Sequence, residues 1–189
     1  MANISSTESD LEPAHTLADI VATLRASMAF DMTMTPDAHH DLLDHGLQTA
    51  TVLAAWCPDD LELQIAGLVH DIGHVLPPFA DDVHGDVASD YVRPVLGDRV
   101  ADLVRLHVPA KRYLCTVEPT YAAELDWGST ATLEVQGGLM TPAEVAAFAQ
   151  QPNVDAAIVL RRADEEGKVP GLSVPDLHSW MPTLRAVAS

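Results

Sequence analysis

The sequence predicts an all-α protein that folds as a single domain. Apolar residues recur every three or four positions in most segments, as at Leu61, Ile65, Leu68 and Ile72, which is the spacing of one helix face. Alternation with a period of two, the pattern of a half-buried strand, is scarce. A chain of 189 residues can bury roughly 70% of its unfolded surface in one core, and it contains no repeat or low-complexity linker that would divide it.

The N-terminal half begins with a tail and continues with helices of clear period. Residues 1–12 have neither the basic nor the apolar region of a signal peptide, and we expect them to form a flexible tail. The first helix is predicted from the spacing of Leu17, Ile20 and Leu24. The third is predicted to begin at Pro58-Asp-Asp, since proline and aspartate favour the first turn of a helix.

The C-terminal half is punctuated by glycine and by a capping motif. Thr141-Pro-Ala-Glu is a capping box with proline at the first helical position, and Gly137-Gly separates it from the preceding segment. The predicted domain therefore occupies residues 13–189. In chain order, the predicted helices span 13–30, 41–56, 59–74, 84–96, 98–107, 118–126, 141–150, 153–166 and 175–187.

Charge and composition restrict the partners and the compartment. The net charge of −18, from 28 acidic and 10 basic residues, opposes binding to nucleic acid or to an anionic membrane. No window approaches the run of apolar residues that a membrane span needs. Cys57 and Cys115 are too few for a disulfide framework and lack the spacing of a zinc knuckle. We therefore expect a cytoplasmic protein, either a monomer or a weak homo-oligomer.

The pair His70-Asp71 is the most informative local feature. It lies at the polar edge of an otherwise apolar predicted helix, where a buried imidazole and carboxylate are costly unless they are hydrogen-bonded or bind a cation. Neighbouring residues on a helix point about 100° apart, so the imidazole could bind one metal ion while the carboxylate reaches two. A hydrogen-bonded pair in the core explains the dipeptide equally well.

Four further residues extend this pair to a candidate metal-binding set. His45, His84 and His107 lie in separate predicted helices, and Asp164 lies in another. Nitrogen and oxygen ligands that converge from different helices are the usual way in which a helical bundle builds a metal site. Each histidine alone is more often a surface or core residue, but the ordered set favours a dinuclear metal centre.

Basic residues cluster beside two of these candidates. Lys111 and Arg112 lie shortly after one candidate histidine, and Arg161 and Arg162 lie shortly before the last aspartate. In so acidic a chain this clustering predicts a local pocket for a small anion. Ordinary solvated surface charge is the alternative interpretation.

Three longer phrases resemble a known family. They are His107-Val-Pro-Ala-Lys-Arg-Tyr-Leu, Leu133-Glu-Val-Gln-Gly-Gly and Arg161-Arg-Ala-Asp-Glu-Glu-Gly-Lys. Over about residues 40–170 the chain resembles the HD-domain superfamily and, within it, the mixed-valent di-iron oxygenases that degrade organophosphonates, which are relatives of myo-inositol oxygenase. The resemblance implies an HD-domain helical bundle that uses O2 and an Fe(II)/Fe(III) pair. Its substrate would be a small anionic 1-hydroxyalkylphosphonate, whose C–P bond is cleaved to phosphate and a carboxylate.

The resemblance also implies a role for each candidate residue. Asp71 would bridge the two iron ions and would be catalytic, as would His74. His74 would donate to the substrate or move a proton, with a hydrogen bond to a metal ligand as the alternative. The substrate pocket would be lined by His74, Lys111, Ser129 and Arg161. One iron would be held by His45, His70, Asp71 and Asp164, and the other by Asp71, His84 and His107.

The chain departs from the family in the loop before His45. Phosphonate oxygenases of this kind carry a tyrosine that caps one iron and a glutamate that meets a substrate amine, and residues 31–40 contain neither. Because an unpaired desolvated ammonium is costly, we expect a substrate that does not depend on a primary amine. A simple 1-hydroxyalkylphosphonate is the first choice and a quaternary-ammonium analogue the second. Water, His39 or His40 would take the place of the tyrosine at the iron.

Two other functions are compatible with the ligand residues. An HD-domain phosphohydrolase would use two metal ions to activate water for attack on a nucleotide or phosphoester. The phrases that contain Lys111, Gln136 and Arg161 favour the oxygenase, as does an aromatic content of 5%, which offers little for binding a base. A degenerate HD module that only binds a ligand or partner would have lost ligand residues, and none of the candidate ligands is lost.

Overall fold

Helices form the regular structure of the chain. The computed structural model describes residues 11–32 and 40–188, so the predicted tail 1–12 lies largely outside the described residues. Within these ranges the β-type pairing is limited to an isolated bridge between Asp31 and Asp41, and the predicted all-α class is confirmed. The helices are α1 (Leu17–Ala26), α2 (Leu42–Trp56), α3 (Leu61–Val69), α4 (His84–Val117), α5 (Pro119–Glu124), α6 (Trp127–Leu133), α7 (Pro142–Phe148), α8 (Val154–Glu166) and α9 (Leu177–Val187).

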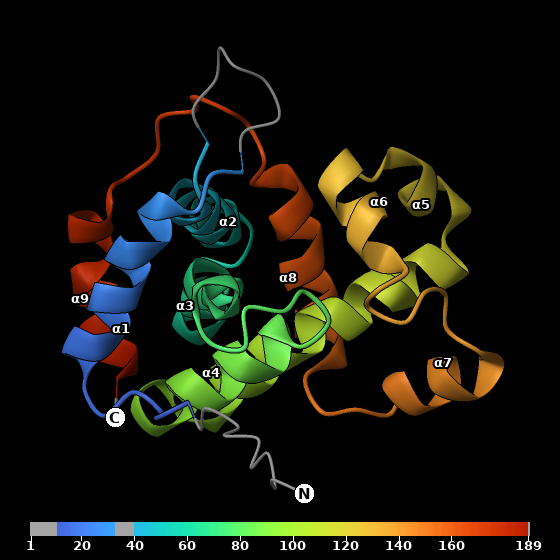
Figure 1. Cartoon of the computed structure of the whole chain (residues 1–189), viewed down its shortest axis with the longest axis horizontal. Coiled ribbons are helices and arrows are strands. Elements are labelled where there is room, and N and C mark those ends of the chain that lie inside the picture. The colour runs from blue at the N-terminus through green and yellow to red at the C-terminus, as the bar shows by residue number, and fades with distance from the viewer. Residues whose placement is uncertain (1–10, 33–39, 189) are drawn as a thin grey trace, which may run out of the picture.

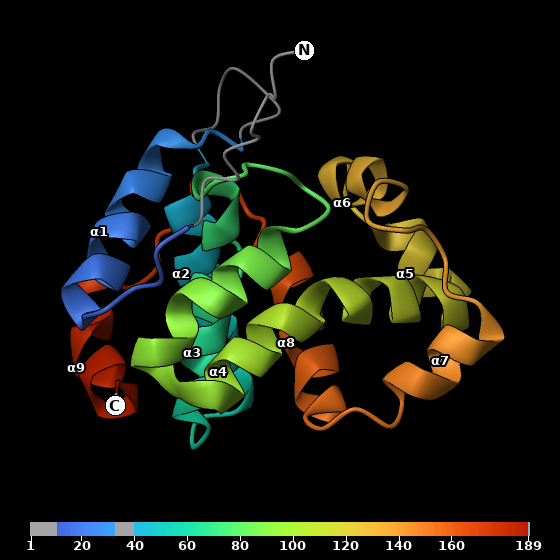
Figure 2. The same ribbon diagram turned by 60° about the horizontal axis from the view of Figure 1, so that its bottom comes forward.

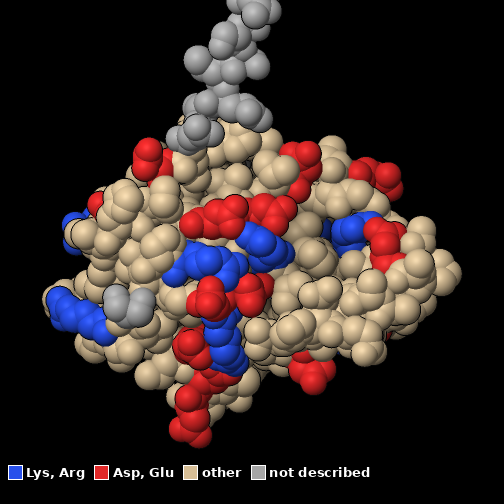
Figure 3. Space-filling model, turned by 90° about the horizontal axis from the view of Figure 1, so that it is seen from below, with Lys and Arg blue, Asp and Glu red and all other residues tan. Residues whose placement is uncertain are grey.

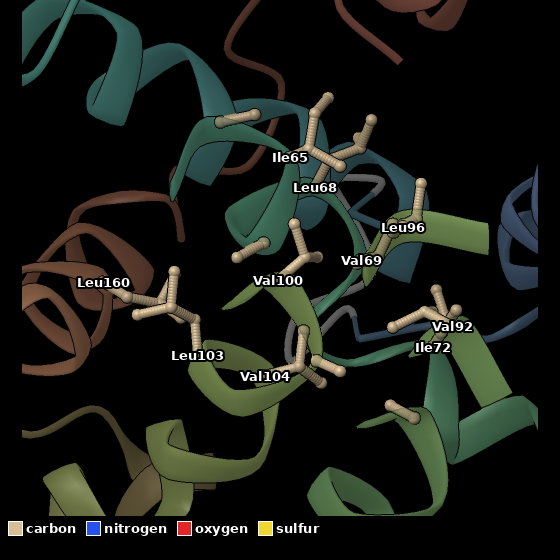
Figure 4. Close-up of a cluster of buried hydrophobic side chains, with 14 of the residues drawn as sticks. Ile65, Leu68, Val69, Ile72, Val92, Leu96, Val100, Leu103, Val104 and Leu160 are labelled. Atoms are coloured by element: carbon tan, nitrogen blue, oxygen red, sulfur yellow. The ribbon is translucent and has the colours of Figure 1, made fainter. Parts of the chain in front are cut away.

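The central core joins α2, α3, α4 and α8. Figure 1 shows α2 and α3 at the centre and α4 crossing below them, while α1 and α9 lie on one side and α5, α6 and α7 on the other. Helix α2 packs against α3 and α8, and α4 packs against the same two helices. Side chains of α3, α4 and α8 that are at most 2% exposed form the centre of the core (Figure 4): Ile65, Leu68, Val69, Val100, Leu103, Val104 and Leu160. No helix in the described ranges is long and apolar enough to cross a membrane.

Helix α4 is folded back on itself at Gly97. This glycine has φ 83° and ψ 171°, a conformation that residues with a Cβ rarely adopt, and it joins two helical arms. Arg105 of the second arm lies 3.2 Å from Asp86 of the first, and His107 lies 2.9 Å from His84 (both arms are visible in Figure 2). Figure 3 shows basic side chains flanked by acidic ones on the face where α4 lies. The bend therefore brings His84, at the start of the first arm, beside His107, near the middle of the second arm.

The predicted helix 59–74 is interrupted before its end. Helix α3 stops at Val69, and a short 3₁₀ helix covers Ile72–Val75. A Cβ added at Gly73 would lie 2.0 Å from the carbonyl oxygen of His84, so only glycine permits this close approach to α4. The interruption places the His-Asp pair in a turn at the end of α3 rather than on a helix face.

Other predicted helices are present with shifted ends. The predicted helix 13–30 is α1 followed by a 3₁₀ helix at Ser27–Ala29, because the side chain of Thr16 caps α1 with reciprocal hydrogen bonds to Asp19. The predicted break after residue 96 is confirmed by the bend in α4, although its second arm runs ten residues further than expected, to residue 117. Helix α6 was not predicted, since its 7 residues are too few to show an apolar period.

Candidate functional site

Candidate ligands from three helices and one turn converge inside the bundle. They come from α2, from the turn after α3, from both arms of α4 and from α8, and they form two groups in which the ligand atoms lie within 4.8 Å of one another. Five of the side chains are at most 3% exposed and the sixth, that of Asp71, is 15% exposed. The first group is His45, His70 and Asp164, and the second is Asp71, His84 and His107.

The carboxylate of Asp71 lies between the two groups. Its Oδ2 atom is 3.5 Å from Nε2 of His45 and 3.3 Å from Nε2 of His70. Its Oδ1 atom is 3.4 Å from Nε2 of His84 and 3.3 Å from Nε2 of His107. Because α3 has already ended, the residue has φ −103° and ψ 1°, and the side-chain directions of a helix, used in the sequence argument, do not apply. A carboxylate that presents one oxygen to each group has the arrangement of a bridging ligand.

Each of the four histidines is oriented by a backbone carbonyl. The Nδ1 atoms of His70, His84 and His107 lie 2.8, 2.7 and 2.6 Å from the carbonyl oxygen of the residue three positions earlier. The Nδ1 atom of His45 lies 2.9 Å from the carbonyl oxygen of Gly167, at the end of α8. A carbonyl only accepts, so Nδ1 donates in each case, and Nε2 faces the centre with a lone pair whenever the ring is neutral.

The centre fits a pair of metal cations. The Nε2 atoms of His45 and His70 are buried without a hydrogen-bond partner, and that of His45 faces Oδ1 of Asp164 at 3.1 Å. A lone pair and a carboxylate oxygen repel at this distance unless a cation lies between them. Although burial alone would lower it, the charges of Asp71 and Asp164 raise the pKa of His70 to about 10, so the field favours positive charge here. Imidazoles and carboxylates without a thiolate suit first-row transition metals.

The two carboxylates remain ionised in this buried setting. Burial alone would raise the pKa of Asp71, but the charge of His70 and hydrogen bonds from the surrounding histidines hold it well below the ordinary value. The pKa of Asp164 is likewise well below its ordinary value, because Arg161 and Lys168 outweigh the effect of burial. Both groups can therefore serve as anionic ligands at neutral pH.

A cavity of about 460 Å³ opens onto this centre. Such a volume is typical of pockets for small organic ligands. The lining includes four of the candidate ligands, namely Asp71, His84, His107 and Asp164. It also includes the cations Lys111, Arg161 and Lys168, and the apolar side chains Phe30, Met32, Val108, Trp127 and Pro170.

Lys111 is a buried cation without a carboxylate partner in the described part of the chain. Its side chain donates to Oγ1 of Thr132 at 2.9 Å and to the carbonyl oxygen of Ser129 at 3.3 Å. Burial, followed by the charge of Arg161, lowers the pKa of Lys111 to about 8. Lys111 as a whole residue is 4% exposed, so its ammonium is largely shielded from water. An anion that enters the cavity would gain a charge-assisted hydrogen bond there.

Arg161 and Ser129 belong to a tightly bonded cluster that also contains Lys168. The hydroxyl of Ser129 accepts hydrogen bonds from Nη2 of Arg161 at 2.9 Å and from Nζ of Lys168 at 2.7 Å. The same hydroxyl lies 2.8 Å from Oε1 of Glu165, to which it donates. Arg161 also bonds to Asp164, so this cluster is joined directly to the first metal-binding group.

Comparison with known proteins identifies the family. The HD-domain family profile matches residues 42–165. The chain belongs to the HD-domain family. This confirms the resemblance that the sequence phrases indicated.

Named relatives of this HD domain include two phosphonate dioxygenases. The chain is 42% identical over 147 residues to hydroxymethylphosphonate dioxygenase of Gimesia maris, and the match covers 73% of each chain. It is 34% identical over 152 residues to 1-hydroxy-2-(trimethylamino)ethylphosphonate dioxygenase (glycine-betaine-forming) of Leisingera caerulea, covering 76% of this chain and 77% of the relative. It is also 30% identical over 148 residues to the uncharacterised protein L432 of Acanthamoeba polyphaga mimivirus, covering 73% and 67%.

His74 of the HD domain lies in the cavity wall beside the second metal-binding group. Its ring is stacked on that of His84, with centroids 4.1 Å apart, and Phe30 covers it at 5.5 Å. Its Nδ1 atom is 3.3 Å from Oδ1 of Asp81. Burial lowers the pKa of His74. Stacking against these two rings restricts the plane of the His74 ring in the cavity wall.

Two of the clustered arginines point away from the cavity. Arg112 bonds to the carbonyl oxygen of Gly138 and to Glu144, and Arg162 forms an ion pair with Glu118. In each of the two basic pairs predicted from sequence, one residue lines the cavity and the other does not: Lys111 and Arg161 line it. Lys168 also lines the cavity and was not predicted to do so, although its position four residues after Asp164 places it one helical turn beyond that ligand.

Proposed function

We propose that this HD-domain protein is a dioxygenase that cleaves the C–P bond of a small 1-hydroxyalkylphosphonate. The observation that carries the proposal is the Asp71 carboxylate, which lies between two histidine groups beside a cavity that contains the buried cation Lys111. The names of the relatives at 42% and 34% identity support oxygen chemistry over phosphoester hydrolysis. One O2 added to hydroxymethylphosphonate gives formate and phosphate with all atoms balanced.

Iron is the metal that we propose for both groups. Three or four protein ligands per ion leave positions for the substrate and for O2, in contrast to a closed structural site. An Fe(II)/Fe(III) pair, when bound, would activate O2 and polarise the substrate oxygens, while the substrate carbon supplies the four electrons that reduce O2. The first iron would be held by His45, His70, Asp71 and Asp164, and the second by Asp71, His84 and His107.

The protein side chains would bind and orient the phosphonate. Lys111 is the principal anion-binding group in this proposal, since no described carboxylate neutralises it at close range. Arg161 and Ser129 would complete the phosphonate site. His74 would use Nε2 to meet the substrate hydroxyl or to move its proton, because Nδ1 is directed at Asp81.

The chain's own residues favour a substrate without a primary amine. Residues 33–39, with His39 among them, lie outside the described residues, while His40 lines the cavity with its ring 6.0 Å from that of His45. The apolar side chains of the cavity lining, which include Phe30 and Trp127, would contact a methyl or trimethylammonium group more favourably than a bare ammonium. Hydroxymethylphosphonate carries no ammonium group to be paired, and it is therefore the first substrate to test.

Oxygen dependence of phosphate release is the decisive experiment. Protein expressed with iron is mixed with hydroxymethylphosphonate under air and under argon, and phosphate, formate and O2 consumption are measured. We expect phosphate only under air, with one O2 consumed per phosphate, and no product from the Asp71→Ala variant. Equal phosphate release under argon, or release from a phosphomonoester instead, would overturn the oxygenase proposal in favour of the phosphohydrolase.

A panel of three phosphonates tests the substrate. Turnover of hydroxymethylphosphonate is compared with that of 2-amino-1-hydroxyethylphosphonate and its trimethylated analogue under air. We expect hydroxymethylphosphonate to lead and the primary amine to be the poorest of the three. A strong preference for the primary amine would contradict the inference, and would indicate that a carboxylate such as Asp81 or Asp37 meets the ammonium.

A further inference from the structure

Glu165 holds the anion-binding groups together from behind the cavity wall. A single oxygen, Oε1, accepts hydrogen bonds from Ser129 Oγ at 2.8 Å, from Lys168 Nζ at 2.8 Å and from Nη2 of Arg161. All three donors belong to residues that line the cavity, whereas Glu165 does not line it. Its side chain is 18% exposed, so its charge is only partly screened by water.

The cluster around Glu165 balances its charges internally. Lys168 also bonds to Asp126 at 2.6 Å, and Arg161 also bonds to Asp164. If Asp164 gives its charge to a metal ion, the two cations are left with two carboxylates, those of Asp126 and Glu165. Lys111 then remains as the cavity cation without a close carboxylate. Glu165 determines how much of the positive charge of Arg161 and Lys168 is left to attract an incoming anion.

We propose that Glu165 limits the affinity of the cavity for anions, so that inorganic phosphate can leave after C–P cleavage. Phosphate and the phosphonate group both present oxygens of the same geometry and charge, and a site that binds one binds the other. Removing the charge of Glu165 would leave Arg161 and Lys168 with one more net positive charge facing the cavity. The identity of the leaving anion rests on the proposed function, whereas the charge argument does not.

Phosphate affinity of charge-neutral and charge-conserving variants tests the proposal. Inorganic phosphate is titrated calorimetrically into the iron-loaded wild type and into Glu165→Gln, with iron content and melting temperature measured on the same samples. We expect phosphate to bind about tenfold or more tightly to Glu165→Gln, since one unit charge a few ångströms from the ligand is worth at least that at an interior dielectric near 20. Phosphate should also inhibit turnover of hydroxymethylphosphonate at correspondingly lower concentration.

Two further variants separate charge from structural damage. Glu165→Asp keeps the charge and is expected to bind phosphate within about threefold of the wild type. Glu166→Gln makes the same change of net charge at the exposed neighbouring position, and it should leave phosphate affinity unchanged. A structural role alone would loosen Arg161 and Lys168 and weaken phosphate binding, which is the opposite sign.

The outcomes distinguish this proposal from the proposed function. Phosphate binding by Glu165→Gln that is weaker than, or equal to, that of Glu166→Gln overturns the role of Glu165, whatever the turnover of hydroxymethylphosphonate. If the wild type turns over none of the phosphonates but Glu165→Gln still binds phosphate more tightly, the role of Glu165 stands and the proposed dioxygenase activity fails.

Discussion

The metal-binding and anion-binding halves of the cavity are oriented by different kinds of contact. In the metal-binding half, His70, His84 and His107 each bond to a carbonyl oxygen three residues earlier, a contact that lies within one local segment of backbone. In the anion-binding half, Ser129 of α6 is held by Arg161 of α8 and by Lys168 beyond it, so side chains hold one another across distant elements. These three histidines thus depend on local backbone, whereas the anion site depends on the assembled fold, as does His45 with its bond to the carbonyl oxygen of Gly167.

This difference predicts how each half responds to substitution. A histidine aimed by the backbone keeps its direction when neighbouring side chains change, and the carboxylate of Asp71 is the candidate ligand that faces both groups. In the anion-binding half each donor is aimed by another charged side chain, and the loss of one member disturbs several. Substitutions ordered from the largest expected effect to the smallest can test this contrast.

Loss of Asp71 should have the largest effect. Its two oxygens each face two histidines, so Asp71→Ala removes a ligand from both metal-binding groups at once. We expect the wild type to hold two iron ions per chain, the variant to hold one or fewer, and turnover to be abolished. Elemental analysis of protein from iron-supplemented cultures measures this. One metal ion or fewer in both proteins would contradict a dinuclear centre.

Lys111 and Arg161 should differ from one another. Lys111→Ala removes a cation with no close carboxylate and is expected to cost about 2–3 kcal/mol, or about 30- to 150-fold in kcat/KM, while iron content stays constant. Arg161→Ala should lose a similar amount of substrate interaction and also weaken iron binding, because Arg161 contacts the candidate ligand Asp164. Kinetics and iron content are measured on the same preparations.

Arg112 and Arg162 supply matched controls for that pair. Both are adjacent in sequence to the cavity cations but bond to Glu144 and Glu118 instead. Their alanine variants should change kcat/KM by less than about threefold, since neither arginine is among the residues that line the cavity. Identical kinetics in all four alanine variants would show that no basic side chain here binds the substrate.

Sequence patterns predicted the metal-binding half well for a local reason. His45, His84 and His107 lie in helices whose period is visible in the chain, and the carbonyl partners of His84 and His107 follow from short-range geometry. The pattern placed the His70-Asp71 pair on a helix, but α3 ends before this pair. That ending depends on the close packing of Gly73 against α4, a helix that follows later in the chain. Such an approach has no signature in local spacing.

The anion-binding half was predicted less completely because its contacts span long separations. Lys111 and Arg161 stood out as basic residues near candidate ligands, and both line the cavity. Lys168 and Asp126 are 42 residues apart in the chain, and the short helix α6 that Asp126 caps shows no apolar period. Their pairing follows from how α6 lies against α8, which only the assembled structure gives.

The bend of α4 should matter for stability and for the second metal-binding group. At Gly97 a Cβ would meet no atom within 4 Å, so the cost of Gly97→Ala is backbone strain, about 1–3 kcal/mol of unfolding free energy. Because the bend brings His84 beside His107, iron affinity should fall as well. Urea unfolding and iron titration measure the two effects.

Gly171 offers a control for the bend, since it also has positive φ and open space but lies outside α4. Gly171→Ala should show comparable or smaller strain and unchanged iron affinity. Equal loss of iron from both variants would indicate that general destabilisation, rather than the placement of the two arms, controls metal binding.

The pH dependence of Lys111 should give the smallest effect, and its sign separates binding from folding. Burial lowers the pKa of Lys111 to about 8, so the free enzyme loses this cation as pH rises through that value, and kcat/KM for a phosphonate should fall about fivefold between pH 8 and 9. Unfolding stability should change in the opposite direction. The unfolded chain keeps its lysine protonated up to about pH 10.4. Loss of the proton from buried Lys111 therefore makes the folded state more stable between about pH 8 and 10.

Lys111→Arg keeps a charged side chain throughout this range and should lose both trends relative to the wild type. Parallel pH profiles of kcat/KM and of the free energy of unfolding measure this, and a decline in kcat/KM that persists unchanged in Lys111→Arg would assign the titration to another group.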